Sequence, residues 1–99
     1  MKWDIQTVGF NADETLTDYA KEKASGLTKY FEHIVGIEVY LKLDYNDKQE
    51  NKVAEIKLNI PGNDIYADSR SDSFEGAINQ SCEKLKAQIR KLKTKMSTH

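Results

Sequence analysis

Two long stretches of the chain place apolar residues three or four positions apart, which is the spacing of one face of an α-helix. They cover residues 11–32 and 72–96. In the second stretch the apolar positions are Phe74, Ala77, Ile78, Cys82, Leu85, Ile89, Leu92 and Met96. The pattern predicts two amphipathic helices, each with one face available for burial in a core.

Both predicted helices begin at a polar residue that precedes a glutamate by three positions. Asn11 precedes Glu14, and Asp72 precedes Glu75, so each helix start has the pattern of a capping box. Gly26 lies inside the first helix and should weaken it by about 1 kcal/mol relative to alanine. We favour close packing against a neighbouring helix, rather than a break, as the reason for this glycine.

Four shorter segments alternate apolar and polar residues, which predicts β-strands with one buried face. They lie at residues 2–8, 37–44, 54–60 and 65–68. The polar segment 45–51 predicts a hairpin loop, and Pro61-Gly62-Asn63 predicts a turn. Residues 69–71 are expected to lead into the second helix.

The predicted order is β-α-β-β-β-α, an α+β fold. Three consecutive strands with short connections form an antiparallel meander, and both helices can cover one face of a four-stranded sheet. The other face is polar and mixed in sign. It carries Asp4, Gln6, Glu38, Tyr40, Lys42, Glu55, Lys57, Asn59 and Asp68. Tyr40 and Tyr66 are too few to form the row of exposed aromatic residues on which a sheet stacks RNA bases.

A length of 99 residues suits one domain, expected over residues 1–96 with a short tail at 97–99. The chain has no apolar run of about 18 residues and no apolar block at its N-terminus, so we expect neither a membrane span nor a signal peptide. Its one cysteine, Cys82, cannot form an internal disulfide. These features predict a cytoplasmic protein.

Charge is distributed unevenly along the chain. The whole sequence has 15 Lys and Arg against 16 Asp and Glu. The segment from Lys84 to Lys95 holds 6 cations and no acid, which leaves 9 bases against 16 acids elsewhere. A nearly neutral protein therefore gathers positive charge on one end of one helix, an asymmetry that points to a polyanionic partner.

At about 100° per residue, the 6 cations form two rows that flank the apolar stripe. One row is Lys84, Lys91 and Lys95, and the other is Lys86, Arg90 and Lys93. The rows can be solvated side chains whose stems cover the edge of the core, and cations at a helix C-terminus also complement its dipole. They can also bind phosphates as point charges. The absence of acids favours binding, since a merely soluble helix usually mixes Glu with Lys.

The first helix can extend this basic surface. Lys23 is expected beside the second helix, where it would face Lys84 and Lys91 across a basic groove. Such a groove recognises the shape of a nucleic-acid backbone more than its sequence.

Catalysis has no support in the sequence. Cys82 lies on an apolar stripe, which predicts a buried structural thiol. Neither His33 nor His99 has a metal-ligand or triad partner at a recognisable spacing, and no metal-binding or glycine-rich phosphate motif occurs. We expect no enzyme, metal, cofactor or small-molecule substrate.

Taken together, several segments resemble the ribosome hibernation promoting factors, also known as ribosome-associated inhibitors or sigma-factor modulation proteins. The similarity covers nearly the whole chain. It rests on the order and spacing of Leu27–Ile34, Val39–Lys42, Ile60–Asn63, Asp72–Ile78 and Lys84–Lys91.

The resemblance implies a fold distantly like a double-stranded RNA-binding domain, and a role without catalysis. Family members bind the small ribosomal subunit in the channel used by messenger and transfer RNA, and block translation in stationary phase or stress. Basic residues of both helices contact ribosomal RNA. The matching positions are Lys23, Lys84, Lys91 and Lys95, with Lys93 also implied.

The chain departs from the family pattern at three positions that are often basic, where it has Thr17, Gly26 and Ala87. Lys86 and Arg90 can compensate from a different angle. The expected ribosomal RNA contacts are therefore Lys23, Lys84, Lys86, Arg90, Lys91, Lys93 and Lys95.

The chain also resembles the short form of the family, so no built-in ribosome-dimerisation domain is expected. Two alternatives stay open. One is a protein-interaction module that modulates a transcription factor, and the other is a general binder of double-stranded RNA.

Overall fold

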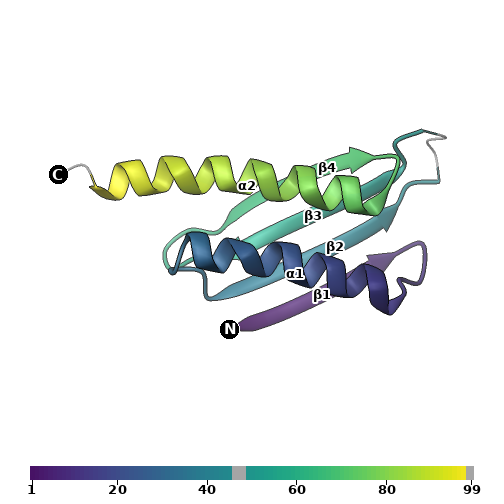
Figure 1. Ribbon diagram of the computed structural model, residues 1–99, viewed down its shortest axis with the longest axis horizontal. Coiled ribbons are helices and arrows are strands. Elements are labelled where there is room, and N and C mark those ends of the chain that lie inside the picture. The colour runs from purple at the N-terminus through teal and green to yellow at the C-terminus, as the bar shows by residue number, and fades with distance from the viewer. Residues whose placement is uncertain (46–48, 98–99) are drawn as a thin grey trace.

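The computed structural model describes residues 1–45 and 49–97, which form a four-stranded sheet and two helices (Figure 1). The order β-α-β-β-β-α and the α+β class are confirmed. The elements are β1 (Lys2–Val8), α1 (Glu14–Tyr30), β2 (Gly36–Leu43), β3 (Lys52–Asn59), β4 (Ile65–Ser71) and α2 (Phe74–Ser97).

The strands lie in the order β1-β2-β3-β4. β1 and β2 are parallel, with Trp3 opposite Ile37, because α1 carries the chain back across the sheet between them. The predicted antiparallel meander of β2, β3 and β4 is confirmed. Pro61 and Gly62 form the turn between β3 and β4, where the φ of +95° at Gly62 suits a residue without a Cβ atom.

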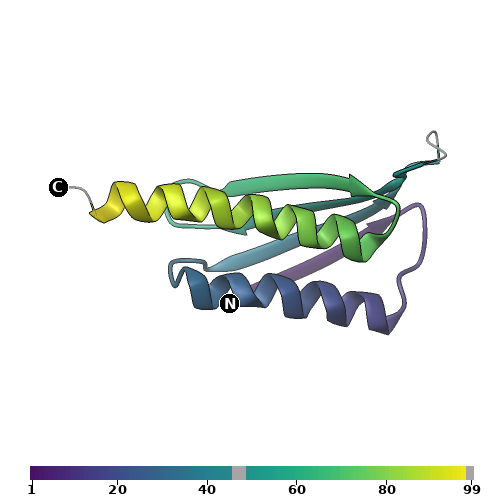
Figure 2. The same cartoon turned by 45° about the horizontal axis from the view of Figure 1, so that its top comes forward.

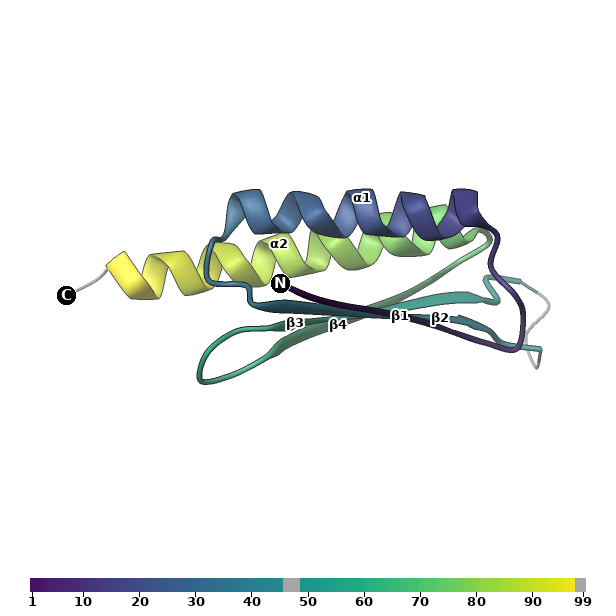
Figure 3. The same cartoon turned by 90° about the horizontal axis from the view of Figure 1, so that it is seen from below.

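Both helices cover the same face of the sheet, as Figure 3 shows in a view along the layers. The alternation of the strands explains this arrangement, because it gives every strand an apolar side. On α2, Ser81 is buried beside these apolar residues, and its hydroxyl donates a 2.7 Å hydrogen bond to the carbonyl oxygen of Ala54. Fully buried side chains from both layers form the core, among them Leu27, Ile37, Leu41, Ile56, Leu58, Ile78, Leu85 and Ile89.

The caps of both helices differ from the predicted ones. Asp13 caps α1, where its carboxylate accepts a 2.9 Å hydrogen bond from the backbone N–H of Leu16. Ser73 caps α2 by accepting a 3.0 Å bond from the N–H of Gly76. The capping boxes predicted at Asn11 and Asp72 are therefore wrong by one or two positions, because another good capping residue stands closer to each helix.

Two further expectations about local structure are corrected. Residues 69–71 continue β4, since Ser69 pairs with Ala54 and Ser71 with Lys52 on β3. Gly26 lies on the exposed side of an unbroken α1, and a Cβ atom built there would meet nothing within 4 Å. Close packing against another helix is thus not the reason for this glycine.

Two predicted segments include residues outside the described part of the chain. The predicted loop 45–51 includes positions 46–48, which lie outside them. Beside this loop, the N–H of Asp44 donates a 2.8 Å bond to the carbonyl oxygen of Asn51. Of the predicted tail, α2 includes Ser97, and residues 98 and 99 lie outside the described part.

The two helices run side by side in the same direction, so both C-termini point to the same end of the molecule (Figure 2). The last turns of α2 project past the end of the sheet (Figure 1). Within residues 1–45 and 49–97, neither helix combines the length and the apolar content of a bilayer span.

Candidate nucleic-acid interface

One cationic row of α2 faces α1. The Arg90 side-chain Nε donates a 3.2 Å hydrogen bond to the hydroxyl of Tyr30, in the last turn of α1. The Lys93 ammonium lies 4.4 Å from the centroid of the same tyrosine ring, within the range of a cation–π contact. Lys86 lies on this side of the helix as well, because it precedes Arg90 by about one turn.

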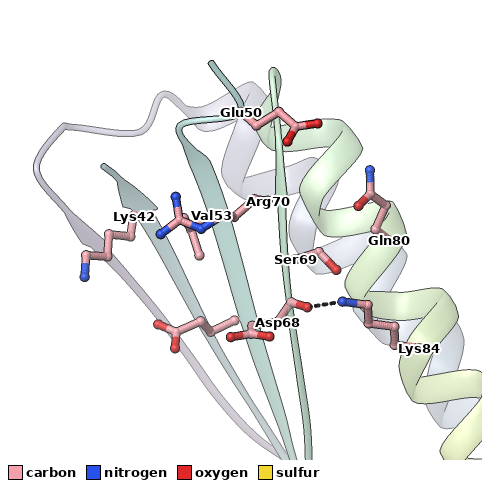
Figure 4. Close-up of a pocket in the computed structure, with 9 residues that line it drawn as sticks. Lys42, Glu50, Val53, Asp68, Ser69, Arg70, Gln80 and Lys84 are labelled. Atoms are coloured by element: carbon pink, nitrogen blue, oxygen red, sulfur yellow. Dashed lines mark hydrogen bonds between the residues drawn. The ribbon is translucent and has the colours of Figure 1, made fainter. Parts of the chain in front are cut away.

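The other row lies toward the edge of the sheet. Lys84 donates a 2.6 Å hydrogen bond from its ammonium group to the carbonyl oxygen of Asp68 on β4 (Figure 4). The Gln88 amide, one turn further along, donates a 2.7 Å bond to the carbonyl oxygen of Tyr66 on the same strand. Lys91 and Lys95 follow Lys84 at helical spacing and share its side of α2.

The predicted groove is therefore wrong in one respect. Lys84 contacts β4, so it does not face Lys23 across a groove between the helices. On the side of α2 that faces α1, Lys86 acts with its positive charge on the buried thiol of Cys82, as Lys23 does from α1. Burial raises the pKa of Cys82 to about 11, and the charges of Lys86 and Lys23 partly oppose that rise. The basic surface between the helices is accordingly taken as Lys23, Lys86, Arg90 and Lys93, of which Lys86 also pairs with Glu83 at 3.5 Å.

Tyr30 joins the two helices at the positive end of this surface. Its hydroxyl accepts the Arg90 hydrogen bond, which lowers its pKa, and the charges of Arg90, Lys93 and Lys86 act in the same direction. In the sequence Tyr30 reads only as part of an apolar stripe. No local signal relates it to Arg90, 60 positions later in the chain, so its role was not predicted.

Charge is also polarised along the helix axes. Acidic residues stand in the first turns, with Glu14 on α1 and Glu75 on α2, whereas Lys29 and Lys95 stand in the last turns. Because the helices are parallel in direction, these charges collect at opposite ends of the molecule (Figure 2). The arrangement complements both helix dipoles and concentrates positive potential at the C-terminal end.

The open face of the sheet is mixed in charge, and its tyrosines are bonded to acids. Carboxylates of Glu55 and Asp68 lie 2.7 and 3.2 Å from the Tyr66 hydroxyl, and the bond to Glu55 is the main reason that the pKa of Tyr66 is raised. The Tyr40 hydroxyl donates a 3.4 Å bond to Glu38. Both tyrosines are held within a network of acids, so this face does not offer RNA a cationic or stacking surface.

An open depression of about 610 Å³ is lined by residues of the sheet and by Gln80 and Lys84 of α2 (Figure 4). Its lining is mixed in sign, with the acids Glu50, Glu55 and Asp68 and the bases Lys42, Arg70 and Lys84. Ser69 lines it too, and its hydroxyl has no hydrogen-bond partner within the described residues. The mixed charges of this depression do not select an anion.

The residues named above as candidates for catalysis or metal binding can be placed in the described part of the chain, except for His99. Cys82 is buried, as predicted, and its raised pKa keeps the thiol protonated. His33 packs edge-on against Phe31, with the ring centroids 5.0 Å apart, and His99 lies outside the described residues. In the described part of the chain, no three His, Cys, Asp or Glu side chains gather in a way that could hold a metal ion.

Known proteins resemble this chain over almost its whole length. The profile of the family described as Sigma 54 modulation protein / S30EA ribosomal protein matches residues 3–97. The chain belongs to this family. A ribosome hibernation promoting factor of Pseudomonas putida is 31% identical over 98 residues, which cover 99% of this chain and 92% of that protein.

Other relatives are longer, and a solved structure shares the fold. A ribosome hibernation promotion factor of Deinococcus radiodurans is 31% identical over 83 residues, which are 83% of this chain and 44% of the relative. The chain thus spans less than half the length of that protein. A ribosomal subunit interface protein from Coxiella burnetii superposes with a TM-score of 0.83 at 20% identity, covering 95% of this chain and 99% of that one.

Proposed function

We propose that this protein is a ribosome-binding hibernation factor that acts in the bacterial cytoplasm. The proposal is supported chiefly by the cationic segment 84–95 of α2, which contains no acid, in a chain that belongs to the S30EA family. The names of the relatives from Pseudomonas putida and Deinococcus radiodurans support ribosome hibernation as the process. We place the binding site on the small subunit, in the channel used by messenger and transfer RNA.

The mechanism is steric occlusion without chemistry. Phosphates of ribosomal RNA would lie along the surface between the helices, against Lys23, Lys86, Arg90 and Lys93. Lys91 and Lys95 would meet further phosphates from the other side of the projecting end of α2. Lysines act there as point charges and Arg90 as a planar donor. Lys84 belongs to the proposed set too, but its ammonium is already bonded to β4.

Sedimentation tests the proposal directly. In a lysate of stationary-phase cells the protein should travel with small subunits or whole ribosomes through a sucrose gradient. Binding should weaken steeply as salt rises, because each phosphate contact releases counterions. A protein that stays at the top of the gradient at moderate salt contradicts the proposal.

Charge reversal locates the surface. The double variant Arg90→Glu with Lys93→Glu should no longer sediment with ribosomes. Both cations lie at the C-terminal end of the basic surface between the helices. Lys42→Glu with Lys57→Glu is the matched control, because it changes the net charge equally on the open face of the sheet. Equal loss in both variants would show that overall charge, and not this surface, governs binding.

Two alternatives give different outcomes. The family description includes modulation of sigma 54, so a protein-interaction module would bind its partner regardless of the reversal at Arg90 and Lys93. A general binder of double-stranded RNA would hold free duplexes as tightly as ribosomes. We favour the ribosome, because the curated relatives that match over most of this chain are named for it.

A further inference from the structure

A small apolar cavity of about 260 Å³ lies where the turn between β3 and β4 meets the C-terminal ends of the helices. The buried ring of Phe31 and the partly buried Leu92 line its inner part. His33, Pro61 and Asn63 are exposed at its mouth. Pockets for drug-sized molecules measure about 300 to 1,000 Å³, so this cavity suits a single flat ring system.

The cavity adjoins the positive end of the molecule. Phe31 directly follows Tyr30, whose hydroxyl bonds Arg90, and Leu92 directly precedes Lys93, whose ammonium lies over the Tyr30 ring. Phe31 and Leu92 of the hollow are thus each next in sequence to a residue of the cationic surface. A ligand that combines a flat apolar ring with a linked anion matches both features.

We propose that this cavity receives one unstacked nucleobase of an RNA strand whose phosphates lie against Arg90 and Lys93. The base would enter beside the His33 ring, which offers a stacking surface, while the Asn63 amide can donate to or accept from a base edge. This inference rests on the proposed function. It adds a binding site for one base to a surface that would otherwise contact only the phosphates of the RNA.

Charge favours a nucleobase over an apolar side chain of a protein. A leucine or phenylalanine from a partner would fill the hollow equally well, but it brings no anion to the neighbouring cations. A nucleotide carries the phosphate within a few bonds of its base. Bases that leave their stack are commonly held on aromatic side chains in this way.

The test compares two RNA probes on the full chain. One is a single-stranded heptanucleotide of adenosine, and the other is the same ribose-phosphate strand without bases. The wild-type protein should bind the adenosine strand about 5-fold or more tightly, because only that strand supplies a base to stack. Asn63→Leu, which places an aliphatic side chain without a stacking face at the mouth of the cavity, should remove most of the difference and leave the affinity for the abasic strand unchanged.

Two further variants serve as controls for the change at Asn63. His33→Ala removes stacking surface without adding bulk and should reduce the same difference, so the test remains valid if the leucine disturbs the turn. Gln6→Leu makes the same kind of change at an exposed residue of the sheet and should keep the difference.

Equal binding of the two strands by the wild-type protein overturns the base site and leaves the phosphate surface intact. If the wild-type protein binds both strands equally but Asn63→Leu no longer binds the ribosome, the occupant is a protein side chain. Failure of the protein to bind any RNA or ribosome instead contradicts the proposed function itself.

Discussion

The ammonium group of Lys84 donates a 2.6 Å hydrogen bond to the backbone carbonyl oxygen of Asp68, and so joins α2 to β4. β4 is an edge strand, and Gln88 bonds a second carbonyl of it at Tyr66. Edge strands expose backbone groups that other chains can pair with. Lys84 therefore positions the helix and covers an edge, in addition to any contact with RNA.

Lys84→Met should lower the free energy of unfolding by up to about 1 kcal/mol, because it removes a hydrogen bond from an exposed cation. Lys91→Met is the matched control on the same side of the helix. Within the described residues Lys91 makes no hydrogen bond or ion pair, so its replacement should change stability by less than about 0.5 kcal/mol. Urea denaturation of both variants measures the difference, and identical midpoints would show that the bond to Asp68 contributes nothing.

Tyr30 should be the first of three tyrosines to ionise as pH rises. The hydrogen bond from Arg90 lowers its pKa, whereas burial beside Glu38 raises that of Tyr40, and the bond to Glu55 raises that of Tyr66. Ultraviolet titration of tyrosinate should show an early component that Tyr30→Phe removes. Arg90→Gln should move this component to higher pH, and a titration unchanged by Arg90→Gln would exclude the contact.

The same shifts predict opposite effects on stability in alkali. Tyr30 ionises more readily when folded, so its contribution is present above the ordinary tyrosine pKa near 10 and is lost as pH falls through the folded value. Tyr66 ionises less readily when folded, so its contribution is present below about pH 10 and is lost as pH rises. Tyr66→Phe should therefore flatten the loss of stability on the alkaline side, as measured by urea unfolding at increasing pH.

The order of elements could be predicted because period-two and three-to-four spacings directly mark which side of each element is buried. The same spacing gave both cationic rows of α2. It could not show which row faces α1, because a helical wheel contains no information about the position of the neighbouring element. Only tertiary contacts, such as those of Lys84 with Asp68 and Arg90 with Tyr30, decide that.

The ends of the elements were harder to predict for a related reason. Asp13 and Ser73 cap the helices, although Asn11 and Asp72 fit the capping-box spacing. Several polar residues near a helix start can serve as a cap, and the chain path selects one of them. Ser71 extends β4 for a similar reason, since pairing with Lys52 on β3, and not apolar alternation, holds it in the strand.

Cys82 should react slowly with alkylating reagents in the folded protein. Its pKa is raised from 9.0 to about 11 by burial, so the reactive thiolate is about 100-fold less populated at neutral pH than in the unfolded chain. Alkylation by iodoacetamide with and without urea, followed by mass spectrometry, measures the ratio. Comparable rates in both conditions would show that the thiol is open to solvent.

Gly26→Ala should stabilise the protein by up to about 1 kcal/mol, because alanine favours the helix and loses less backbone entropy on folding. The added Cβ meets no atom within 4 Å and the residue has no positive φ. Gly76→Ala is the control, since its Cβ would come within 2.6 Å of the Ser71 hydroxyl and 3.0 Å of the Ser73 hydroxyl that caps α2. Thermal unfolding should therefore rise for the first variant and not for the second; a lower melting temperature for Gly26→Ala would mean that the glycine has a structural role in α1.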